Sequence, residues 1–192
     1  MEEEKRANAA RFFISVYTEH VGKEGNAMAL FLPTRYFKRV EDITKTDLAQ
    51  MGIRGILLDV DNTLSSHGSP DPLPAALRWA REMREAGMKM MIVSNNTRER
   101  VAPFAEKFGL PFVSMALKPL PAGFARCRKQ MNLKKREILV VGDQLFTDVL
   151  GANLGGMPSA LVEPVEPEDQ PLLRFKRRLE KPLLKRGKRK GG

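Results

Sequence analysis

Between Ile53 and Val162 the sequence alternates short apolar runs with longer segments of helical periodicity, and this alternation restricts the fold more than any other feature. Each run has the length of a strand that is buried on both faces. The expected strands are Ile53–Asp59, Met88–Ser94, Pro111–Met115, Ile138–Gly142 and Ser159–Val162. Strands separated by helices pair in parallel through right-handed crossovers. We therefore expect an α/β fold built on a doubly wound parallel sheet.

Three segments between these strands carry apolar residues at helical spacing: Pro74–Ala86, Arg98–Phe108 and Pro121–Met131. Proline opens the first and the third, where its missing N–H has no helical partner to lose. Gly87 and Gly109 follow the first and the second, as glycine commonly does where a helix ends. These signals place the crossover helices of the sheet.

Polar residues stand at the ends of the expected strands, and in a parallel sheet the carboxyl ends of the strands are where chemistry collects. They are Asp59 and Asp61 after the first strand, Ser94 and Asn95 after the second, Lys118 beyond the third, and Asp143, followed by Asp148, after the fourth. The sequence therefore predicts one polar site at this edge of the sheet.

Asp59 and Asp61 lie two residues apart, so their carboxylates would repel each other unless a cation lies between them or one holds a proton. Such a pair alone also occurs as surface charge or as a turn former. Ser94 and Asn95 add a hydroxyl and an amide for phosphate oxygens, Lys118 adds a positive charge, and further carboxylates could hold Mg²⁺. The combination points to phosphate chemistry far more specifically than any one part.

These residues resemble the four motifs of the haloacid dehalogenase-like (HAD) superfamily, matched in order by DVDNT, SN, K and GDxxxxD within residues 53–162. The strings LFLPTRYFKRV and ITKTDLAQMGIRGILLDVDNTL extend the resemblance, from Leu30 through Pro164, to the YqeG family. That family includes subclass IIIA phosphatases and is similar to mitochondrial phosphatidylglycerophosphatase. The resemblance implies a HAD-like Rossmannoid fold and a Mg²⁺-dependent phosphatase.

By this resemblance Asp59 is the nucleophile that forms an aspartyl-phosphate, and Asp61 is the general acid and then the base for the hydrolytic water. Mg²⁺ would be held by Asp59, the backbone carbonyl of Asp61, and Asp143. Substrate-binding roles fall to the backbone N–H groups of Val60 and Asn62, to Thr63, and to Ser94 and Lys118, which would clamp the phosphoryl oxygens; Asn95 and Asp148 would support them.

For some of these residues the sequence also allows a purely structural role. Lys118 could lie in a surface turn before Pro119, Ser94 could cap the helix that starts near Arg98, and Asp148 could be a charge near a helix N-terminus. His67 lies in the stretch SSHGSPDP and is expected to be an exposed loop residue, with substrate contact as the alternative.

The spacing leaves no room for a cap domain, because 35 residues separate Asp59 from Ser94 and 24 separate Ser94 from Lys118. One helix and one strand fill each interval, together with a loop in the first. We expect an open site that suits a large or surface-presented substrate, with selectivity from loop Ser65–Asp71. With a single cysteine, Cys127, the chain cannot form the zinc loop of some uncapped relatives.

Most of the net charge of +10 lies at the C-terminus, where residues 174–192 hold ten Lys or Arg and one acid, Glu180. Such a block could contact acidic membrane or RNA through residues 174–190, or serve only as a solvated tail. We divide the chain into an N-terminal extension (1–50), a HAD-like phosphatase core (51–166) and a basic C-terminal helix or tail (167–192). No protein partner can be derived.

The N-terminal extension carries weaker secondary-structure signals. Helices are possible at Arg11–Thr18 and at Thr44–Met51, the latter capped by Thr44. The apolar stretch Ala27–Phe37 either covers an edge or face of the sheet or dips into a membrane surface. The acidic start and the lack of a long apolar run predict neither a signal peptide nor a membrane span. We expect a cytoplasmic protein, with peripheral contact to a membrane as the further option.

Three functions fit the sequence. The preferred one is hydrolysis of a lipid phosphate, phosphatidylglycerophosphate, to phosphatidylglycerol, because it explains the open site, the apolar stretch and the basic tail together. The second is a phosphatase for a nucleic-acid, ribosome-associated or small soluble phosphate. The third is a non-catalytic RNA- or ribosome-binding protein on a HAD scaffold, although all the catalytic positions are filled.

Overall fold

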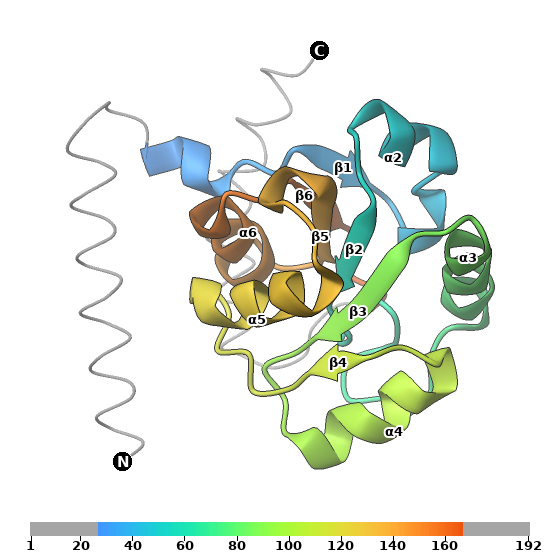
Figure 1. Cartoon of the computed structure of the whole chain (residues 1–192). Coiled ribbons are helices and arrows are strands. Elements are labelled where there is room, and N and C mark those ends of the chain that lie inside the picture. Colours follow the sequence, from blue (N-terminus) through green and yellow to red (C-terminus); the bar gives the residue numbers. More distant parts are fainter. Residues whose placement is uncertain (1–26, 167–192) are drawn as a thin grey trace, which may run out of the picture.

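Six parallel strands form one sheet in the order β1-β6-β5-β2-β3-β4 in the computed structural model, which describes residues 27–166 (Figure 1). The strands are β1 (Arg35–Phe37), β2 (Gly55–Leu58), β3 (Lys89–Val93), β4 (Phe112–Val113), β5 (Ile138–Gly142) and β6 (Ser159–Val162). The chain runs outward from β2 to β4 and then returns to the other side of β2 through β5 and β6. This confirms the predicted doubly wound parallel sheet.

Helices cover both faces of the sheet, and the strand residues alternate between them. The helices are α2 (Lys45–Gln50), α3 (Pro74–Glu85), α4 (Arg98–Phe108), α5 (Pro121–Met131) and α6 (Leu150–Gly155), with the 3-10 turns η1 (Ala27–Phe31), η2 (Val40–Asp42) and η3 (Lys135–Glu137) and a π-helical turn, η4 (Leu145–Val149). In β2, Ile56 and Leu58 join the core cluster under α3 and α4, whereas Leu57 joins the cluster under α5 and α6. A strand buried on both faces explains the uninterrupted apolar runs.

The helix ends follow the local chemistry of the sequence. Thr44 caps α2, because its hydroxyl accepts a hydrogen bond from Asp47 N while the Asp47 carboxylate accepts one from Thr44 N at 2.9 Å. Gly109 ends α4 in a left-handed conformation with φ 60°. The three crossover helices lie where the periodicity predicts them.

The edge strand β1 is a sixth strand that the sequence analysis did not predict. It pairs with β6, Arg35 with Ala160 and Phe37 with Val162. The preceding segment is fastened by Asn153, whose Nδ2 donates to the carbonyl oxygens of Leu30 at 2.7 Å and Leu32 at 3.1 Å. The apolar stretch 27–37 therefore covers one edge of the sheet.

No domain inserted between the motifs appears in residues 27–166: one helix and one strand fill each interval, so the prediction of an uncapped core is confirmed. None of the helices in this range has the length and apolar character needed to span a bilayer. The predicted helix at Arg11–Thr18 and the basic tail lie outside the described residues.

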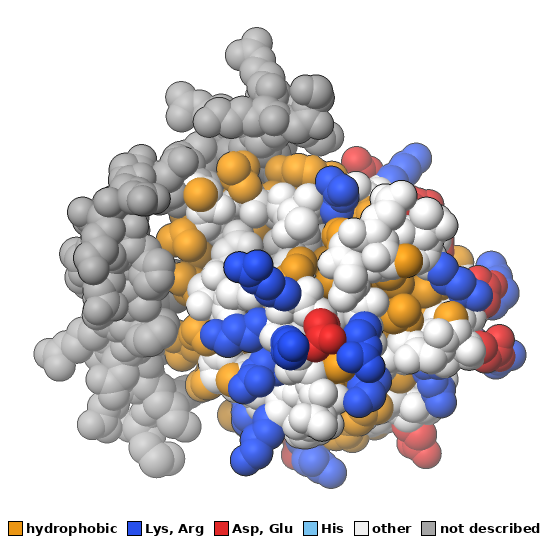
Figure 2. All heavy atoms as spheres, turned by 45° about the horizontal axis from the view of Figure 1, so that its top comes forward, with side chains coloured by type: hydrophobic (Ala, Val, Ile, Leu, Met, Phe, Trp, Pro, Cys, Tyr) orange, Lys and Arg blue, Asp and Glu red, His pale blue; other side chains and the backbone are white. Residues whose placement is uncertain are grey.

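Figure 2 shows a face on which Lys and Arg side chains outnumber the acidic ones. A group of basic residues lies near the amino ends of β2, β3 and β5, and we call them the amino-end cations. They are Arg54, Lys89, Arg128, Lys129, Lys134, Lys135 and Arg136. Contacts tie this region together: Arg54 pairs with Glu137 at 3.1 Å, and Lys89 Nζ donates to the carbonyl of Met131 at the end of α5. These cations lie at the opposite end of the sheet from the polar strand ends.

Candidate active site

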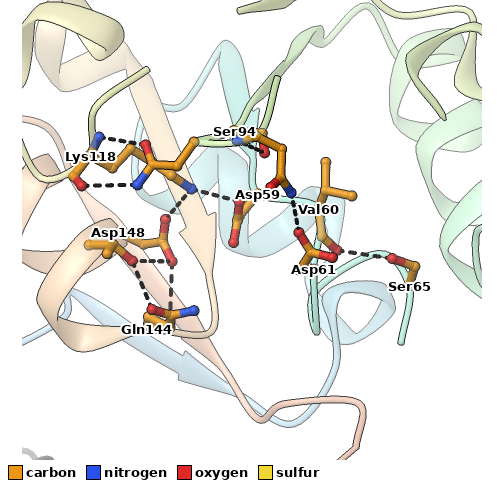
Figure 3. Close-up of polar contacts among 11 residues, drawn as sticks. Asp59, Val60, Asp61, Ser65, Ser94, Lys118, Gln144 and Asp148 are labelled. Carbon is orange, nitrogen blue, oxygen red and sulfur yellow. Dashed lines mark hydrogen bonds and ion pairs between the residues drawn. The ribbon is translucent and has the colours of Figure 1, made fainter. Parts of the chain in front are cut away.

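The polar residues at the carboxyl ends of the strands converge on one buried cluster (Figure 3). Asp59 directly follows β2, Ser94 follows β3, Asp143 follows β5, and Lys118 lies in the connection from β4 to α5. All four are buried. The sheet therefore brings together groups that are far apart in the sequence.

Lys118 joins two of the carboxylates. Its Nζ donates to Asp59 Oδ1 at 2.6 Å and to Asp148 Oδ1 at 2.7 Å, and its side chain is 3% exposed. Burial of this kind excludes the reading of Lys118 as a residue of a surface turn. The ammonium group instead fixes the distance between Asp59 and Asp148.

The pKa of Asp59 is raised to about 7, chiefly by burial; the ammonium of Lys118 and the Val60 backbone N–H oppose the rise, and the nearby Asp148 carboxylate adds to it. For Lys118, burial alone would lower the pKa, but the carboxylates of Asp148 and Asp59 hold the pKa above its ordinary value. The lysine is therefore charged, whereas burial disfavours the ionised form of Asp59.

A divalent cation fits this cluster. Carboxylate oxygens of Asp59, Asp143 and Asp148 lie within 4.8 Å of one another, and all three residues are buried. With the three carboxylates ionised, Lys118 offsets only one of the negative charges, which leaves an excess that a hard cation with oxygen ligands would neutralise. The donor set is that of a magnesium or similar site.

Asp148 is held from its other side by the start of η4. Its Oδ2 accepts hydrogen bonds from Gln144 N at 3.2 Å and Thr147 Oγ1 at 3.3 Å. These contacts leave Oδ1 for Lys118, so Asp148 does more than place a charge near a helix start. Gln144 and Thr147 fill the unspecified positions of the GDxxxxD motif, where sequence reasoning gave them no role.

The Asp61 side chain points away from the carboxylate cluster. Its Oδ1 accepts from Gly68 N at 3.0 Å and Arg100 Nη2 at 2.8 Å, and its Oδ2 accepts from Asn96 Nδ2 at 2.6 Å. Sequence reasoning missed Asn96 and Arg100. Asn96 is adjacent to the SN motif, but the position of Arg100 in the first turn of α4 carried no distinguishing signal.

A tight turn follows Asp59 and positions the next residues. The carbonyl of Val60 accepts from Thr63 N at 3.2 Å, Leu64 N at 2.9 Å and Ser65 N at 3.3 Å. Asn62 adopts φ 57°, a left-handed conformation that asparagine tolerates better than most residues. The backbone of Val60 and Asn62 and the buried Thr63 thus lie immediately beside Asp59.

Asn95 fixes the backbone at Lys118. Its Oδ1 accepts from Lys118 N at 2.7 Å, and its Nδ2 donates to Lys118 O at 3.0 Å. Ser94 does not cap α4, whose N-cap residue is Thr97; the Ser94 hydroxyl accepts from Asn96 N at 3.2 Å. The cap interpretation of Ser94 is therefore wrong, and the side chain lies buried next to the cluster.

Loop Ser65–Asp71 is fastened to α4 beside Asp61. Lys107 Nζ pairs with Asp71 at 2.7 Å and donates to the Pro70 carbonyl at 3.0 Å. A cavity of about 200 Å³ lies between the loop and α4, with Pro70, Arg100 and Phe104 among its lining residues. His67 is exposed in this loop, as expected.

Comparison with known proteins gives results that agree with this site. Residues 68–156 match the family model described as haloacid dehalogenase-like hydrolase. The chain is 43% identical over 161 residues to "Probable phosphatase YqeG" of Bacillus subtilis, which covers 84% of this chain and 94% of that protein. It is 31% identical to "Phosphatidylglycerophosphate phosphatase 1, chloroplastic/mitochondrial" of Arabidopsis thaliana, over 79% of this chain but 47% of that protein.

A solved structure gives the fold alone. An uncharacterized protein from Listeria monocytogenes serotype 4b superposes with a TM-score of 0.50 at 18% sequence identity, over 62% of this chain and 85% of that one.

Proposed function

The chain belongs to the haloacid dehalogenase-like hydrolases and is a phosphatase of that family, and from this premise we propose that it hydrolyses phosphatidylglycerophosphate to phosphatidylglycerol. The observation that carries the proposal is that Lys118 pairs with both Asp59 and Asp148. These ion pairs lie at the carboxyl end of a sheet that no cap domain covers. A buried carboxylate held beside an ammonium group can approach a phosphate that would otherwise repel it.

Asp59 attacks phosphorus and forms an aspartyl-phosphate while the bond to the leaving oxygen breaks. Asp61 must first turn from Arg100 and Asn96 toward Asp59 and take up a proton; it then gives this proton to the leaving oxygen and takes one from the water that hydrolyses the aspartyl-phosphate. Lys118 and Ser94 bind phosphoryl oxygens together with the N–H groups of Val60 and Asn62. Thr63, Asn95 and Asp148 hold this arrangement in place.

Mg²⁺ would be held by Asp59, Asp143 and the backbone carbonyl of Asp61, with Asp148 close to the same cluster. When bound, it would neutralise the charge of the nucleophile and of the phosphate during transfer. The excess of carboxylates over ammonium groups supports a divalent ion at this position.

A lipid substrate is supported by the open site and by the relatives. Residues 27–166 contain no cap that would have to close over a small molecule, so the phosphate group of a lipid could reach Asp59 from a membrane surface. One relative is named as a phosphatidylglycerophosphate phosphatase. We propose a cytoplasmic location with peripheral membrane contact, to which residues 174–190 would contribute.

Phosphate release from phosphatidylglycerophosphate in mixed micelles with Mg²⁺ tests this proposal, beside a soluble aryl phosphate and the variant Asp59→Asn. Lipid turnover well above turnover of the aryl phosphate, abolished by the substitution, is the expected result. Turnover of the aryl phosphate alone would keep the mechanism and reject the lipid.

A phosphatase for a nucleic-acid or ribosome-associated phosphate is the second candidate, favoured by the amino-end cations (Figure 2) and by the basic composition of residues 174–192. A small soluble substrate is favoured instead by a relative named as a ribulose-1,5-bisphosphate 5-phosphatase, 28% identical over 106 residues. Failure of both the lipid and the aryl phosphate would favour the non-catalytic RNA-binding alternative.

A further inference from the structure

Two large apolar side chains are exposed beside Lys118. Met115 is 55% exposed and Leu117 is 54% exposed. Within residues 27–166, these two are the large hydrophobic residues that are exposed. Both lie in the connection from β4 to α5, at the carboxyl end of the sheet. An apolar surface therefore adjoins the candidate active site, and we call Met115 and Leu117 the apolar rim.

The backbone holds the apolar rim in an unfavourable conformation. Met115 has φ 45° and Leu117 has φ 58°, values that cost energy for residues other than glycine. Met115 N donates to Asn96 O at 2.9 Å, and Leu117 O accepts from Leu120 N at 2.8 Å. The connection is thus fixed rather than loosely placed.

Ala116, between the two rim residues, anchors the connection in the interior. It is buried, and it lies so close to Gly123 of α5 that a β-carbon on Gly123 would be 2.5 Å from the Ala116 carbonyl oxygen. With Ala116 turned inward, its neighbours Met115 and Leu117 face solvent. Both residues stay more than half exposed in the described structure, so strain and exposure together point to an intermolecular role.

One cation contacts the apolar rim, and a second lies against β4, the strand that precedes it. Arg126 Nη2 donates to the Met115 carbonyl at 3.3 Å, and the guanidinium of Arg98 lies 5.2 Å from the centroid of the Phe112 ring in β4. Both arginines are exposed. Apolar side chains that insert below the headgroups, beside cations that contact them, are the features of a peripheral site for anionic membrane.

We propose that the apolar rim inserts into the surface of an anionic bilayer and sets the carboxyl end of the sheet against it. This inference rests on the proposed lipid substrate and deepens it, because it states how the phosphate of a membrane lipid reaches Asp59. The amino-end cations would then face away from the bilayer, at the other end of the 11-residue helix α5, about 16 Å long. A membrane bound at that end would turn the site away from its substrate.

The test compares the full chain with the double variant Met115→Asn/Leu117→Asn. Asparagine removes the apolar surface but tolerates the left-handed backbone, so the connection keeps its shape. Binding is measured by co-sedimentation with vesicles of phosphatidylcholine and phosphatidylglycerol in equal parts, at low and raised salt, because apolar insertion resists screening whereas binding by the tail does not. The matched control is Lys134→Glu/Lys135→Glu/Arg136→Glu at the amino end.

We expect the rim variant to bind these vesicles about three- to tenfold more weakly at raised salt, since it loses the burial of two apolar side chains. In a separate assay, with phosphatidylglycerophosphate added to vesicles of this composition, its turnover falls in proportion, while turnover of a soluble aryl phosphate is unchanged. The amino-end variant keeps its binding at raised salt.

Vesicle binding at raised salt that survives in the rim variant, or that is lost in the amino-end variant instead, would overturn the inference. The vesicles used for binding contain phosphatidylcholine and the product lipid but no substrate, so binding is measured without catalysis. Rim-dependent binding without any turnover of the lipid by the wild type would therefore reject the proposed substrate while leaving the membrane contact standing.

Discussion

The carboxylate of Asp148 packs directly over the α-carbon of Gly142: a β-carbon added at position 142 would lie 2.3 Å from Asp148 Cγ and 2.4 Å from its Oδ2. Gly142 ends β5, and Asp148 lies in η4, which begins after the short turn between them. The glycine of the GDxxxxD motif is thus required for space. It lets Asp148 reach Lys118 from within the same loop.

Gly142→Ala should therefore push Asp148 away from Lys118 and disturb the position of Asp59. We expect a loss of about 10²-fold in kcat, because a displacement of this size at a catalytic group is costly, and a destabilisation of about 1–3 kcal/mol from overpacking. Urea denaturation and phosphate release from a soluble aryl phosphate measure the two effects.

Gly155→Ala is the matched control, because Gly155 is also buried near the end of its element but a β-carbon there meets only Met157 atoms at 4.0 Å. It should keep full activity and be neutral or slightly stabilising. Equal losses in the two variants would mean that the contact between Gly142 and Asp148 has no special role.

The assignment of Asp61 as general acid predicts an effect that depends on the leaving group. Asp61→Asn should lower kcat/KM for an alkyl phosphate or the lipid by about 10²–10⁴-fold, since the departing alkoxide needs a proton. A nitrophenyl phosphate, whose leaving group is a weak base, should lose far less. Steady-state kinetics on both substrates, reported as kcat/KM, decides the question, and an equal loss on both would reject the role.

Much of the fold could be predicted because its signals are local. The capping box of Thr44 and Asp47, the prolines that open α3 and α5, and Gly109 at the end of α4 each act within a few residues. The buried strands show as apolar runs for the same reason. Edge strand β1 could not be predicted, because its three residues depend on pairing with β6, more than 120 residues away.

The candidate site, like the fold, could be predicted from the sequence only in part. That Asp59, Ser94, Lys118 and Asp143 would meet follows from the rule that parallel strands end at one edge. The direction of the Asp61 side chain does not follow from any rule of sequence, because it is decided by Arg100, 39 residues away, and by the fold of loop Ser65–Asp71. The tight contact at Gly142 likewise needs the path of η4.

Removal of the Lys118 charge should lower the free energy of unfolding, because the buried carboxylates lose their positively charged partner. Lys118→Met leaves Asp59 and Asp148 without their shared partner, and we expect a destabilisation of about 3–5 kcal/mol in metal-free buffer and complete loss of activity. Urea denaturation with a chelator measures the first effect. Lys38→Met, at an exposed position, should change the unfolding free energy by no more than about 0.5 kcal/mol; a Lys118 variant as stable as this control would contradict the buried charge pair.

The raised pKa of Asp59 predicts how pH changes the stability of the metal-free protein. The carboxyl titrates at about 7 in the folded protein but at about 4 when unfolded. Between these values the folded state binds the proton more tightly than the unfolded state, so the free energy of unfolding falls as pH rises through this window. Lys118, with its pKa raised, changes stability only in the alkaline range and does not alter this sign.

A divalent cation competes with that proton for the Asp59 carboxylate, so its stabilising effect should grow as pH rises through the same window. Thermal denaturation with and without Mg²⁺, at about pH 5 and about pH 8, measures it, and the increase in Tm should be larger at the higher pH because Asp59 is then ionised. Asp59→Asn should remove the dependence, since the amide neither titrates nor offers a charged ligand. An increase in Tm that is the same at both pH values in the wild type would mean that the cation does not bind at Asp59.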